Sequence, residues 1–273
     1  MKQRIITAAV GISLCIAVLI LGAFFPIVIS IAMSLLSAAM VFEYLHAGSL
    51  LKNYGVLITC LLFSLIMPLT VNTAFRLIPI YLFSVILFTV MIISHKTVSF
   101  NKLAFAYAGT LMISLSISSI SVLAFKTYSI YYIIVALAVP WLADAGAYFI
   151  GTFFGKTKLC PDISPKKTVE GAVGGLLTGI VGGLLISVIF QFIVYKSVSV
   201  NYLLVLLVSV LSSVISIIGD LTFSLIKRSC GLKDFGSIMP GHGGFCDRFD
   251  SVIFCAPLVM IFSISFPLMF PAV

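Results

Sequence analysis

The chain has 273 residues, of which 62% are hydrophobic and only 9% are charged, and its mean hydropathy is +1.27. Soluble globular proteins carry about 25% charged residues, so the composition excludes a water-exposed domain of this size. Segments almost free of charge recur along the chain, and each can cross a hydrocarbon layer about 30 Å thick as a helix. We therefore expect an all-α polytopic membrane bundle. The net charge of +8 fits anionic lipid headgroups and phosphates, and we expect no nucleic acid partner.

Nine transmembrane helices are predicted. The first follows a short basic N-terminus and is interpreted as a retained helix, because further apolar spans follow and no clear cleavage site of a signal peptide is present. In chain order the predicted helices are 5–22, 26–45, 54–70, 76–94, 103–124, 129–152, 171–194, 201–227 and 250–271. Only two connections are long, 153–170 and 228–249, and short connections are typical of a compact helical bundle.

The distribution of lysine and arginine predicts the orientation of the helices. With a cytoplasmic N-terminus, 13 of the 16 basic residues lie on the cytoplasmic side, and only Arg76, Lys126 and Lys196 lie on the other. This bias favours nine spans with both long loops in the cytoplasm. We expect a multi-pass protein of the cytoplasmic (inner) cell membrane.

Acidic residues divide the chain into two parts. Of the eight aspartates and glutamates, only Glu43 precedes Asp144. Residues 1–128 are therefore predicted to form a transmembrane scaffold or a vestibule for a lipid. Residues 129–273 are predicted to form the catalytic region, together with the two long cytoplasmic loops.

The predicted helix 201–227 has a polar face. Its polar residues recur at steps of three and four, as expected for one side of a helix: Ser209, Ser213, Ser216, Asp220, Ser224 and Lys227. A charged side chain inside a bilayer costs several kcal/mol, so Asp220 should face the protein interior or a wet cavity. Asp220 is interpreted as a metal ligand or a proton carrier, and the alternative is a structural aspartate that pairs with a lysine or caps a neighbouring helix.

The predicted helix 171–194 carries glycines four residues apart, at Gly171, Gly175, Gly179 and Gly183. Such a face lets another backbone approach closely, so tight helix packing is favoured over a direct role in ligand binding. The packing partner can lie in the same chain or in a second copy, which leaves a homodimer open.

The segment 224–250 combines features that suit phosphate chemistry. Glycines at 241, 243 and 244 allow backbone N–H groups to turn toward an anion. Four basic side chains can neutralise phosphate oxygens: Lys227, Arg228, Lys233 and Arg248. Asp247 and Asp250 are three residues apart and would share a helical face as oxygen ligands for Mg²⁺. His242 is ranked as a phosphate binder before a base.

The segment 144–171 is the predicted partner of that loop. Ser164 and Pro165 begin a turn, and either Thr168 or Ser164 caps the following helix. Lys166 and Lys167 then lie near a helix N-terminus, where N–H groups also favour anions, and we expect them to contact a nucleotide phosphate. Lys156 and Lys158 fit such contacts and a purely topological role equally well.

These two segments resemble bacterial phosphatidate cytidylyltransferases, also called CDP-diacylglycerol synthases. Ser224–Asp250 fills every fixed position of the family pattern S-x-x-K-R-x4-K-D-x-G-x3-P-G-H-G-G-x-x-D-R-x-D. Asp144–Gly171 matches a second pattern, D-x-G-A-Y-F…G-K…S-P-K-K-T-x-E-G. The two motifs cover about a fifth of the chain. The resemblance implies the reaction of CTP with phosphatidic acid to give CDP-diacylglycerol and pyrophosphate.

The resemblance also implies Mg²⁺, with a second metal ion left open, and it identifies Asp220 and Asp247 as the metal-binding carboxylates. Together with the chemistry above, it assigns three sets of residues. The expected catalytic residues are Asp220, Asp247, Lys227 and Arg248. The expected metal ligands are Asp220, Asp247, Ser224 and Asp250. The expected substrate-binding residues are Asp144, Ser164, Lys166, Lys167, Glu170, Arg228, Lys233, His242, Gly243 and Gly244.

Two other functions compete with this interpretation. An intramembrane lipid-alcohol kinase would use CTP as donor of its γ-phosphoryl group and release CDP. A transporter would use Asp220 as a site for a coupling ion. The transporter hypothesis does not account for the charged, glycine-rich segment 224–250, and no inverted repeat is evident in the sequence.

Overall fold

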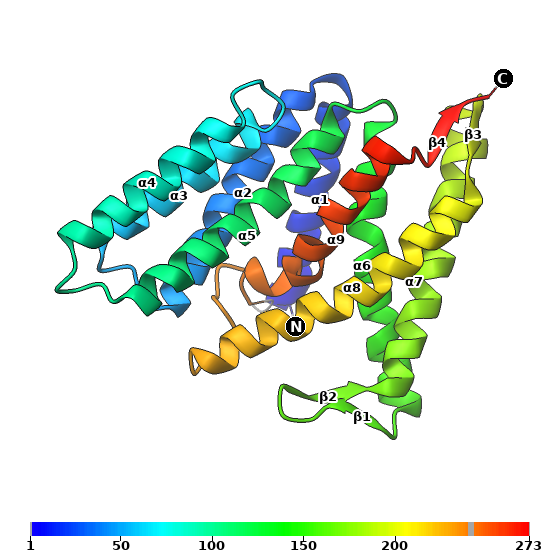
Figure 1. The fold of residues 1–273 in the computed structure, drawn as a ribbon. Helices are drawn as coiled ribbons and strands as arrows, with labels where there is room; N and C mark the ends of the chain where they lie inside the picture. The colour runs from blue at the N-terminus through cyan, green and yellow to red at the C-terminus, as the bar shows by residue number, and fades with distance from the viewer. Residues whose placement is uncertain (1, 240–242, 273) are drawn as a thin grey trace. The chain divides into compact units, whose positions relative to one another are not determined.

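The computed structural model describes residues 2–239 and 243–272, and for residues 2–6 and 8 the backbone only. Within these ranges the chain forms nine α-helices and four short strands (Figure 1). The helices are α1 (Lys2–Phe24), α2 (Pro26–Ala47), α3 (Tyr54–Thr70), α4 (Leu77–Ile93), α5 (Phe100–Ala124), α6 (Ser129–Phe154), α7 (Val169–Ile189), α8 (Tyr202–Ser229) and α9 (Cys246–Ser265). The strands are β1 (Lys158–Cys160), β2 (Ser164–Thr168), β3 (Val198–Val200) and β4 (Met269–Pro271). The predicted all-α bundle of nine helices is confirmed for this part of the chain.

In the described part of the chain, six helices are long and apolar enough to cross a membrane. They are α2, α5, α6, α8, α9, and α7 together with the π-helix Phe190–Tyr195 that continues it. The apolar helix Ala9–Phe24 within α1, and the helices α3 and α4, are shorter. Large apolar side chains such as Leu14 and Phe153 are 65% and 76% exposed, as a lipid-facing surface requires. The chain is therefore a multi-pass membrane protein, and the orientation of its N-terminus remains a prediction.

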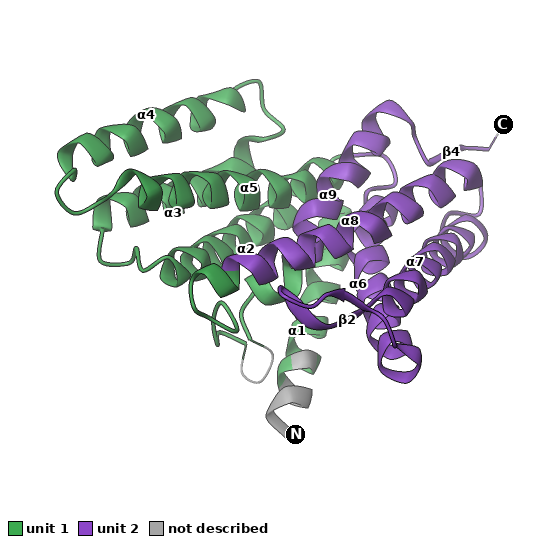
Figure 2. Ribbon diagram, turned by 60° about the horizontal axis from the view of Figure 1, so that its bottom comes forward, with its two compact units in different colours: residues 1–125, 227–249 green, residues 126–226, 250–273 purple. Residues whose placement is uncertain are grey.

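The chain folds into two compact units (Figure 2). Unit 1 comprises residues 1–125 and 227–249, and unit 2 comprises residues 126–226 and 250–273. The division after residue 125 lies close to the predicted division after 128. The segment 228–249, which was assigned to the catalytic region, belongs to unit 1 with the N-terminal helices. Most of α8 and α9 lies in unit 2, but the last residues of α8 and the first residues of α9 belong to unit 1.

Unit 1 is built around α2, which packs against α1, α3 and α5 (Figure 1). Pro26 is placed at the start of α2, where its fixed φ suits a helix and its missing N–H needs no partner. Ser99 caps α5 by accepting a hydrogen bond from the Lys102 amide at 3.4 Å. The C-terminal half of α2 is largely buried, including Met40, Glu43 and Tyr44.

In unit 2, α6 packs along α7, and β1 and β2 form an antiparallel hairpin between them in sequence. The hairpin was not predicted, because 153–170 was expected to be a loop. The predicted helix 250–271 is wrong at both ends: α9 begins at Cys246 and ends at Ser265. Pro267 cannot continue a helix, and the chain beyond it forms β4, which pairs antiparallel with β3.

Candidate active site

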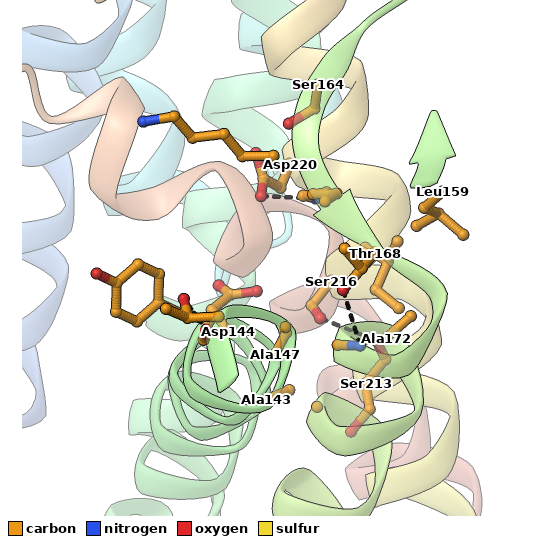
Figure 3. Close-up of a pocket in the computed structure, with 18 of the residues that line it drawn as sticks. Ala143, Asp144, Ala147, Leu159, Ser164, Thr168, Ala172, Ser213, Ser216 and Asp220 are labelled. Carbon is orange, nitrogen blue, oxygen red and sulfur yellow. Dashed lines mark hydrogen bonds and ion pairs between the residues drawn. The ribbon is translucent and has the colours of Figure 1, made fainter. Parts of the chain in front are cut away.

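A cavity of about 450 Å³ lies in unit 2, and α6, the β1–β2 hairpin, α7 and α8 line it (Figure 3). Five residues that the sequence assigned to the site line this cavity: Asp144, Ser164, Lys166, Lys167 and Asp220. They come from three elements that are up to 76 residues apart in sequence. Carboxylates and amines are therefore gathered at one cavity of a chain in which only 9% of the residues are charged.

Asp220 occupies the polar face of α8, as predicted. Its Oδ2 atom is 2.6 Å from the Lys167 Nζ atom on β2, and its Oδ1 atom accepts a hydrogen bond from the Ser224 hydroxyl at 3.2 Å. The side chains of Lys167 and Asp220 are 23% and 30% exposed, so the pair is partly shielded from solvent. Lys167 therefore contacts a carboxylate in this structure, as in the alternative that pairs Asp220 with a lysine, and metal binding by Asp220 remains a prediction.

Asp144 projects from α6 into the same cavity (Figure 3). Its Oδ2 atom accepts a hydrogen bond of 2.6 Å from the hydroxyl of Ser251 on α9. Helix α9 comes this close because α8 has Gly219 at the crossing: a Cβ atom there would lie 2.8 Å from the Asp250 carbonyl oxygen. Sequence reasoning missed Ser251 and Gly219. Their signal was weak, since a lone serine after Asp250 and a glycine before Asp220 are both common in membrane helices.

The β1–β2 hairpin places Ser164, Lys166 and Lys167 at the cavity. Thr168 caps α7 by accepting a hydrogen bond from the Gly171 amide at 3.1 Å, so Thr168 rather than Ser164 is the capping residue. Glu170, in the first turn of α7, accepts hydrogen bonds from the backbone amides of Lys156 and Thr157 at 3.0–3.1 Å. Glu170 does not line the cavity, so it is placed to hold the start of the hairpin.

The glycine face of α7 is used for close packing within the chain. A Cβ atom at Gly179 would lie 2.1 Å from the Ser213 Oγ atom, and one at Gly183 would lie 2.0 Å from the Ser209 Oγ atom, both on α8. Gly175 similarly contacts the Ala143 carbonyl of α6. The predicted tight packing is observed, and it fixes the distance between the helices that carry Asp144 and Asp220.

A second charged cluster lies in unit 1, around Asp247 at the start of α9. The Asp247 Oδ1 atom accepts a hydrogen bond of 2.7 Å from Lys227 Nζ, and the two side chains are 5% and 12% exposed. The Oδ2 atom accepts hydrogen bonds from the amides of Phe235 and Gly244 at 2.9 and 3.0 Å. The ammonium group of Lys227 also lies 5.7 Å from the centre of the Phe235 ring. The Gly244 amide, predicted to bind a phosphate, is thus used by Asp247.

The remaining predicted residues of the segment 224–250 are placed as follows. Arg228 donates a hydrogen bond to the Leu232 carbonyl at 3.2 Å, and Lys233 is exposed. Gly243 has φ +83°, which favours glycine, and its carbonyl accepts a hydrogen bond from the Met239 amide. Asp250 is buried in unit 2, where its Oδ1 atom accepts a hydrogen bond from the Ser251 amide at 2.8 Å. Arg248 lies in the first turn of α9.

His242 lies outside the described residues, together with Gly241. The structure groups Asp144, Lys166, Lys167, Ser164 and Asp220 in unit 2 and Asp247, Lys227 and Gly244 in unit 1. An ion shared by Asp220 and Asp247 remains a prediction, because these two carboxylates belong to different units.

Comparison with known proteins places the chain in a family. The model of the cytidylyltransferase family matches residues 2–266. A phosphatidate cytidylyltransferase of Staphylococcus haemolyticus is 32% identical over 264 residues, which is 96% of this chain and 98% of that protein. A phosphatidate cytidylyltransferase of Bacillus subtilis is 33% identical over 267 residues, covering 95% and 96% of the two chains. With a match over nearly the whole sequence, and with its carboxylates and lysines gathered at one cavity, this chain belongs to the cytidylyltransferase family.

Proposed function

We propose that this protein is a phosphatidate cytidylyltransferase, which transfers the cytidylyl group of CTP to phosphatidic acid. The observation that carries the proposal is the cavity of unit 2, in which Asp144, Asp220 and Lys167 meet in a chain of the cytidylyltransferase family. The relatives that match the chain over almost its full length carry the name of this activity. A phospholipid substrate also fits a protein whose helices are apolar enough to lie in a bilayer.

The chemistry joins two anions. A phosphate oxygen of phosphatidic acid forms a bond to the α-phosphorus of CTP, and the bond from that phosphorus to the oxygen bridging to the β-phosphorus breaks. The products are CDP-diacylglycerol and pyrophosphate. Because the nucleophile is already an anionic phosphate, the main requirements are positioning and neutralisation of charge. Lys158, Lys166 and Lys167 line the cavity and supply fixed positive charge for the phosphates of CTP.

The donors of the cavity fit Mg²⁺. This ion is commonly held by one or two carboxylates and completes its shell with water and substrate phosphates, and Asp144 and Asp220 provide two carboxylates at one cavity. No cluster of three or more histidine, cysteine, aspartate or glutamate side chains is found in the part of the chain that the structure describes, so a cage made of protein ligands alone is not expected there. When bound, the ion would neutralise phosphate oxygens and stabilise the charge that develops on pyrophosphate.

Asp247 is less suited to that role in the observed arrangement, because three protein donors occupy its two carboxylate oxygens. We propose that Asp247 and Lys227 act in the reaction as a pair, with Lys227 as the phosphate-binding cation and Asp247 as the group that orients it. Direct metal binding by Asp247 would require Lys227 to leave. We further propose that the reaction occurs at the cytoplasmic face of the cell membrane, which the distribution of basic residues favours.

The decisive experiment follows two labels on CTP. Purified protein in liposomes that contain phosphatidic acid is given Mg²⁺ and CTP labelled either in the cytidine ring or in the γ-phosphate. The proposal expects the cytidine label in the lipid product and the γ-label in pyrophosphate. Transfer of the γ-label to a lipid with release of CDP would identify a kinase instead. Solute flux without turnover of CTP would identify a transporter.

Lys166 offers a test of nucleotide binding at the hairpin. Lys166 is exposed and lines the cavity, whereas Lys156 is also exposed but does not line it. Lys166→Ala is expected to raise the KM for CTP about 10-fold, because a charge-assisted contact to phosphate is worth about 1.5 kcal/mol. The matched control Lys156→Ala should leave the KM unchanged. Equal KM values for CTP in the two variants would show that Lys166 does not bind the nucleotide and serves only to set the membrane topology.

Ser251 offers a test of the orientation of Asp144. Ser251→Ala removes the 2.6 Å hydrogen bond to Asp144 and is expected to lower kcat/KM about 10-fold, since hydrogen bonds to charged groups contribute about 1.5–3 kcal/mol. Ser263 on the same helix is a matched control, because its hydroxyl donates a hydrogen bond of 2.7 Å to the Met260 carbonyl of its own helix. The test is kcat/KM of both variants from steady-state kinetics. An unchanged kcat/KM in Ser251→Ala would contradict the assignment of Asp144 to the site.

A further inference from the structure

Glu43 is a buried carboxylate in unit 1 that the proposed reaction does not use. It lies on α2 and is only 2% exposed, although an isolated charge in such a position is costly. Its Oε2 atom accepts a hydrogen bond of 2.9 Å from the amide of Cys246, the first residue of α9. A carboxylate at the N-terminus of a helix satisfies an unpaired N–H group and interacts favourably with the helix dipole.

The chain around Cys246 is shaped to receive this carboxylate. We call residues 235–239 and 243–246 the signature turn. Its glycines leave no room for a side chain beside Glu43: a Cβ atom at Gly236 would lie 2.8 Å from the Oε1 atom, and one at Gly244 would lie 2.4 Å from the Oε2 atom. Real Cβ contacts are essentially never this short. A Cβ atom at either position would therefore require the Glu43 carboxylate, at the end of its side chain, to move from its observed place.

Two further contacts hold the signature turn to α2. The Cys246 thiol donates a hydrogen bond of 3.1 Å to the Met40 carbonyl. The ring of Tyr44 stacks on Phe235, with centroids 6.2 Å apart, and also on Phe105 of α5 at 4.3 Å. Successive turns of one helix thus hold both ends of the described turn, and Glu43 lies between them.

The same turn supplies the groups that hold Asp247. The amides of Phe235 and Gly244 donate to its Oδ2 atom, while Lys227 donates to its Oδ1 atom. A displacement of the turn would move both amides, and Asp247 and Lys227 would follow. Glu43 is therefore connected to the proposed catalytic pair through one backbone segment and no intervening side chain of another element.

A packing role alone does not account for a carboxylate at this position. Among the described residues, the Oε1 atom of Glu43 has no hydrogen-bond partner, and a buried polar atom without a partner costs about 1–3 kcal/mol. An apolar side chain of similar size would fill the same space, but it would leave the Cys246 amide without its acceptor. A side chain that stabilised the fold only through packing would not need this charge beside the start of α9.

We propose that Glu43 is a positioning residue that fixes the signature turn, and through it Asp247 and Lys227, for nucleotidyl transfer. The expected effect of Glu43 on kcat rests on the function proposed above, whereas its effect on the position of the signature turn does not. It assigns a part in the reaction to a helix of the N-terminal half, which otherwise has the features of a scaffold.

The test combines kinetics with a measurement that does not depend on activity. Glu43→Gln keeps the size of the side chain but removes its charge. It is expected to lower kcat about 10-fold, as for the loss of one charged contact at a helix start, with less than about a 2-fold change in the KM for CTP. Hydrogen exchange of the intact protein in detergent should become faster in the peptide 233–246 and stay unchanged in the hairpin 158–168.

The matched control is Ser37→Ala on the same helix. Ser37 is buried and lies 3.3 Å from the Ser114 hydroxyl of α5, so the variant perturbs α2 away from the turn. It should change neither kcat nor exchange in 233–246. Equal effects of Ser37→Ala and Glu43→Gln would show a general loss of helix packing and would overturn the proposal.

A rescue experiment tests the contact itself. Gly236→Ala places a Cβ atom against Glu43 and is expected to lower kcat about 10-fold or more, an effect of the size that overpacking produces. Glu43→Asp withdraws the carboxylate by about 1.5 Å, the length of one C–C bond, so the double variant should be more active than Gly236→Ala alone. If the double variant loses activity by the product of the factors for Gly236→Ala and Glu43→Asp, the two residues act independently. The positioning contact then does not exist.

The two proposals fail in different ways. If the wild-type protein does not transfer cytidine to lipid, the function proposed above fails, but exchange in 233–246 still reports whether Glu43 fixes the turn. If the wild-type protein is active and Glu43→Gln matches it in both kcat and exchange, only the positioning role fails.

Discussion

Asp220→Asn is expected to reduce kcat about 100-fold or more, the loss typical of removing one preorganised electrostatic group from an active site. Asp220 lines the cavity, pairs with Lys167 and accepts a hydrogen bond from Ser224. Asparagine has the same shape, so the variant should insert and purify like the wild type. It lacks the negative charge needed to hold a divalent cation, and it leaves Lys167 without its ion-pair partner.

A direct measurement of metal binding separates these two effects. Binding of Mn²⁺, followed by its electron paramagnetic resonance signal, should weaken in Asp220→Asn in the absence of CTP. Asp162→Asn is the control, because Asp162 is an exposed acid in the turn between β1 and β2 of the same unit and does not line the cavity. Near-normal turnover in Asp220→Asn would remove Asp220 from the metal site and leave it as the partner of Lys167.

Asp247→Asn is expected to lower kcat to a similar extent, but for a different reason. Its two oxygens accept from Lys227 on one side and from two backbone amides on the other. An asparagine presents an NH₂ group to one of these sides whichever way it is turned, so donors face donors. Lys227 also becomes a nearly buried charge without its partner, which commonly destabilises a protein by about 3–5 kcal/mol.

The double variant Asp247→Asn/Lys227→Met separates stability from catalysis. Replacement of a buried ion pair by uncharged groups is often neutral for stability, so the double variant should recover much of the thermal stability in detergent that Asp247→Asn loses. It should remain inactive, because the proposed phosphate-binding cation is gone. Recovery of turnover together with stability would show that the pair serves the fold alone.

Glu43 shows the limit of reasoning from local sequence. It stands alone among apolar residues, and the sequence therefore assigned its half of the chain to a scaffold. Its partner Cys246 is 203 residues away, and no local pattern connects the two. The motif that includes Gly236 and Gly244 was identified, but a phosphate-binding role was predicted for Gly244 and no role for Gly236. The structure shows that both glycines make room for Glu43 and that the Gly244 amide serves Asp247.

Helix positions were predictable because apolar length and charge mark them directly. The predicted spans 26–45, 54–70 and 103–124 lie within or match α2, α3 and α5. The errors fall in short strand segments: the β1–β2 hairpin was predicted as loop, and the last helix was extended past Pro267 into β4. Strands of three to five residues leave too short a pattern to be distinguished from loop.

The sequence by itself determined the class of the protein, the count of its helices and the identity of its charged residues. Few charges in a long apolar chain admit only membrane-spanning helices, and the cost of burying a charge marks each one as functional or paired. Only the tertiary structure decided which charges meet. It joins Lys167 to Asp220 and Lys227 to Asp247, and it brings the Ser251 hydroxyl to Asp144, because these contacts are made between elements that are far apart along the chain.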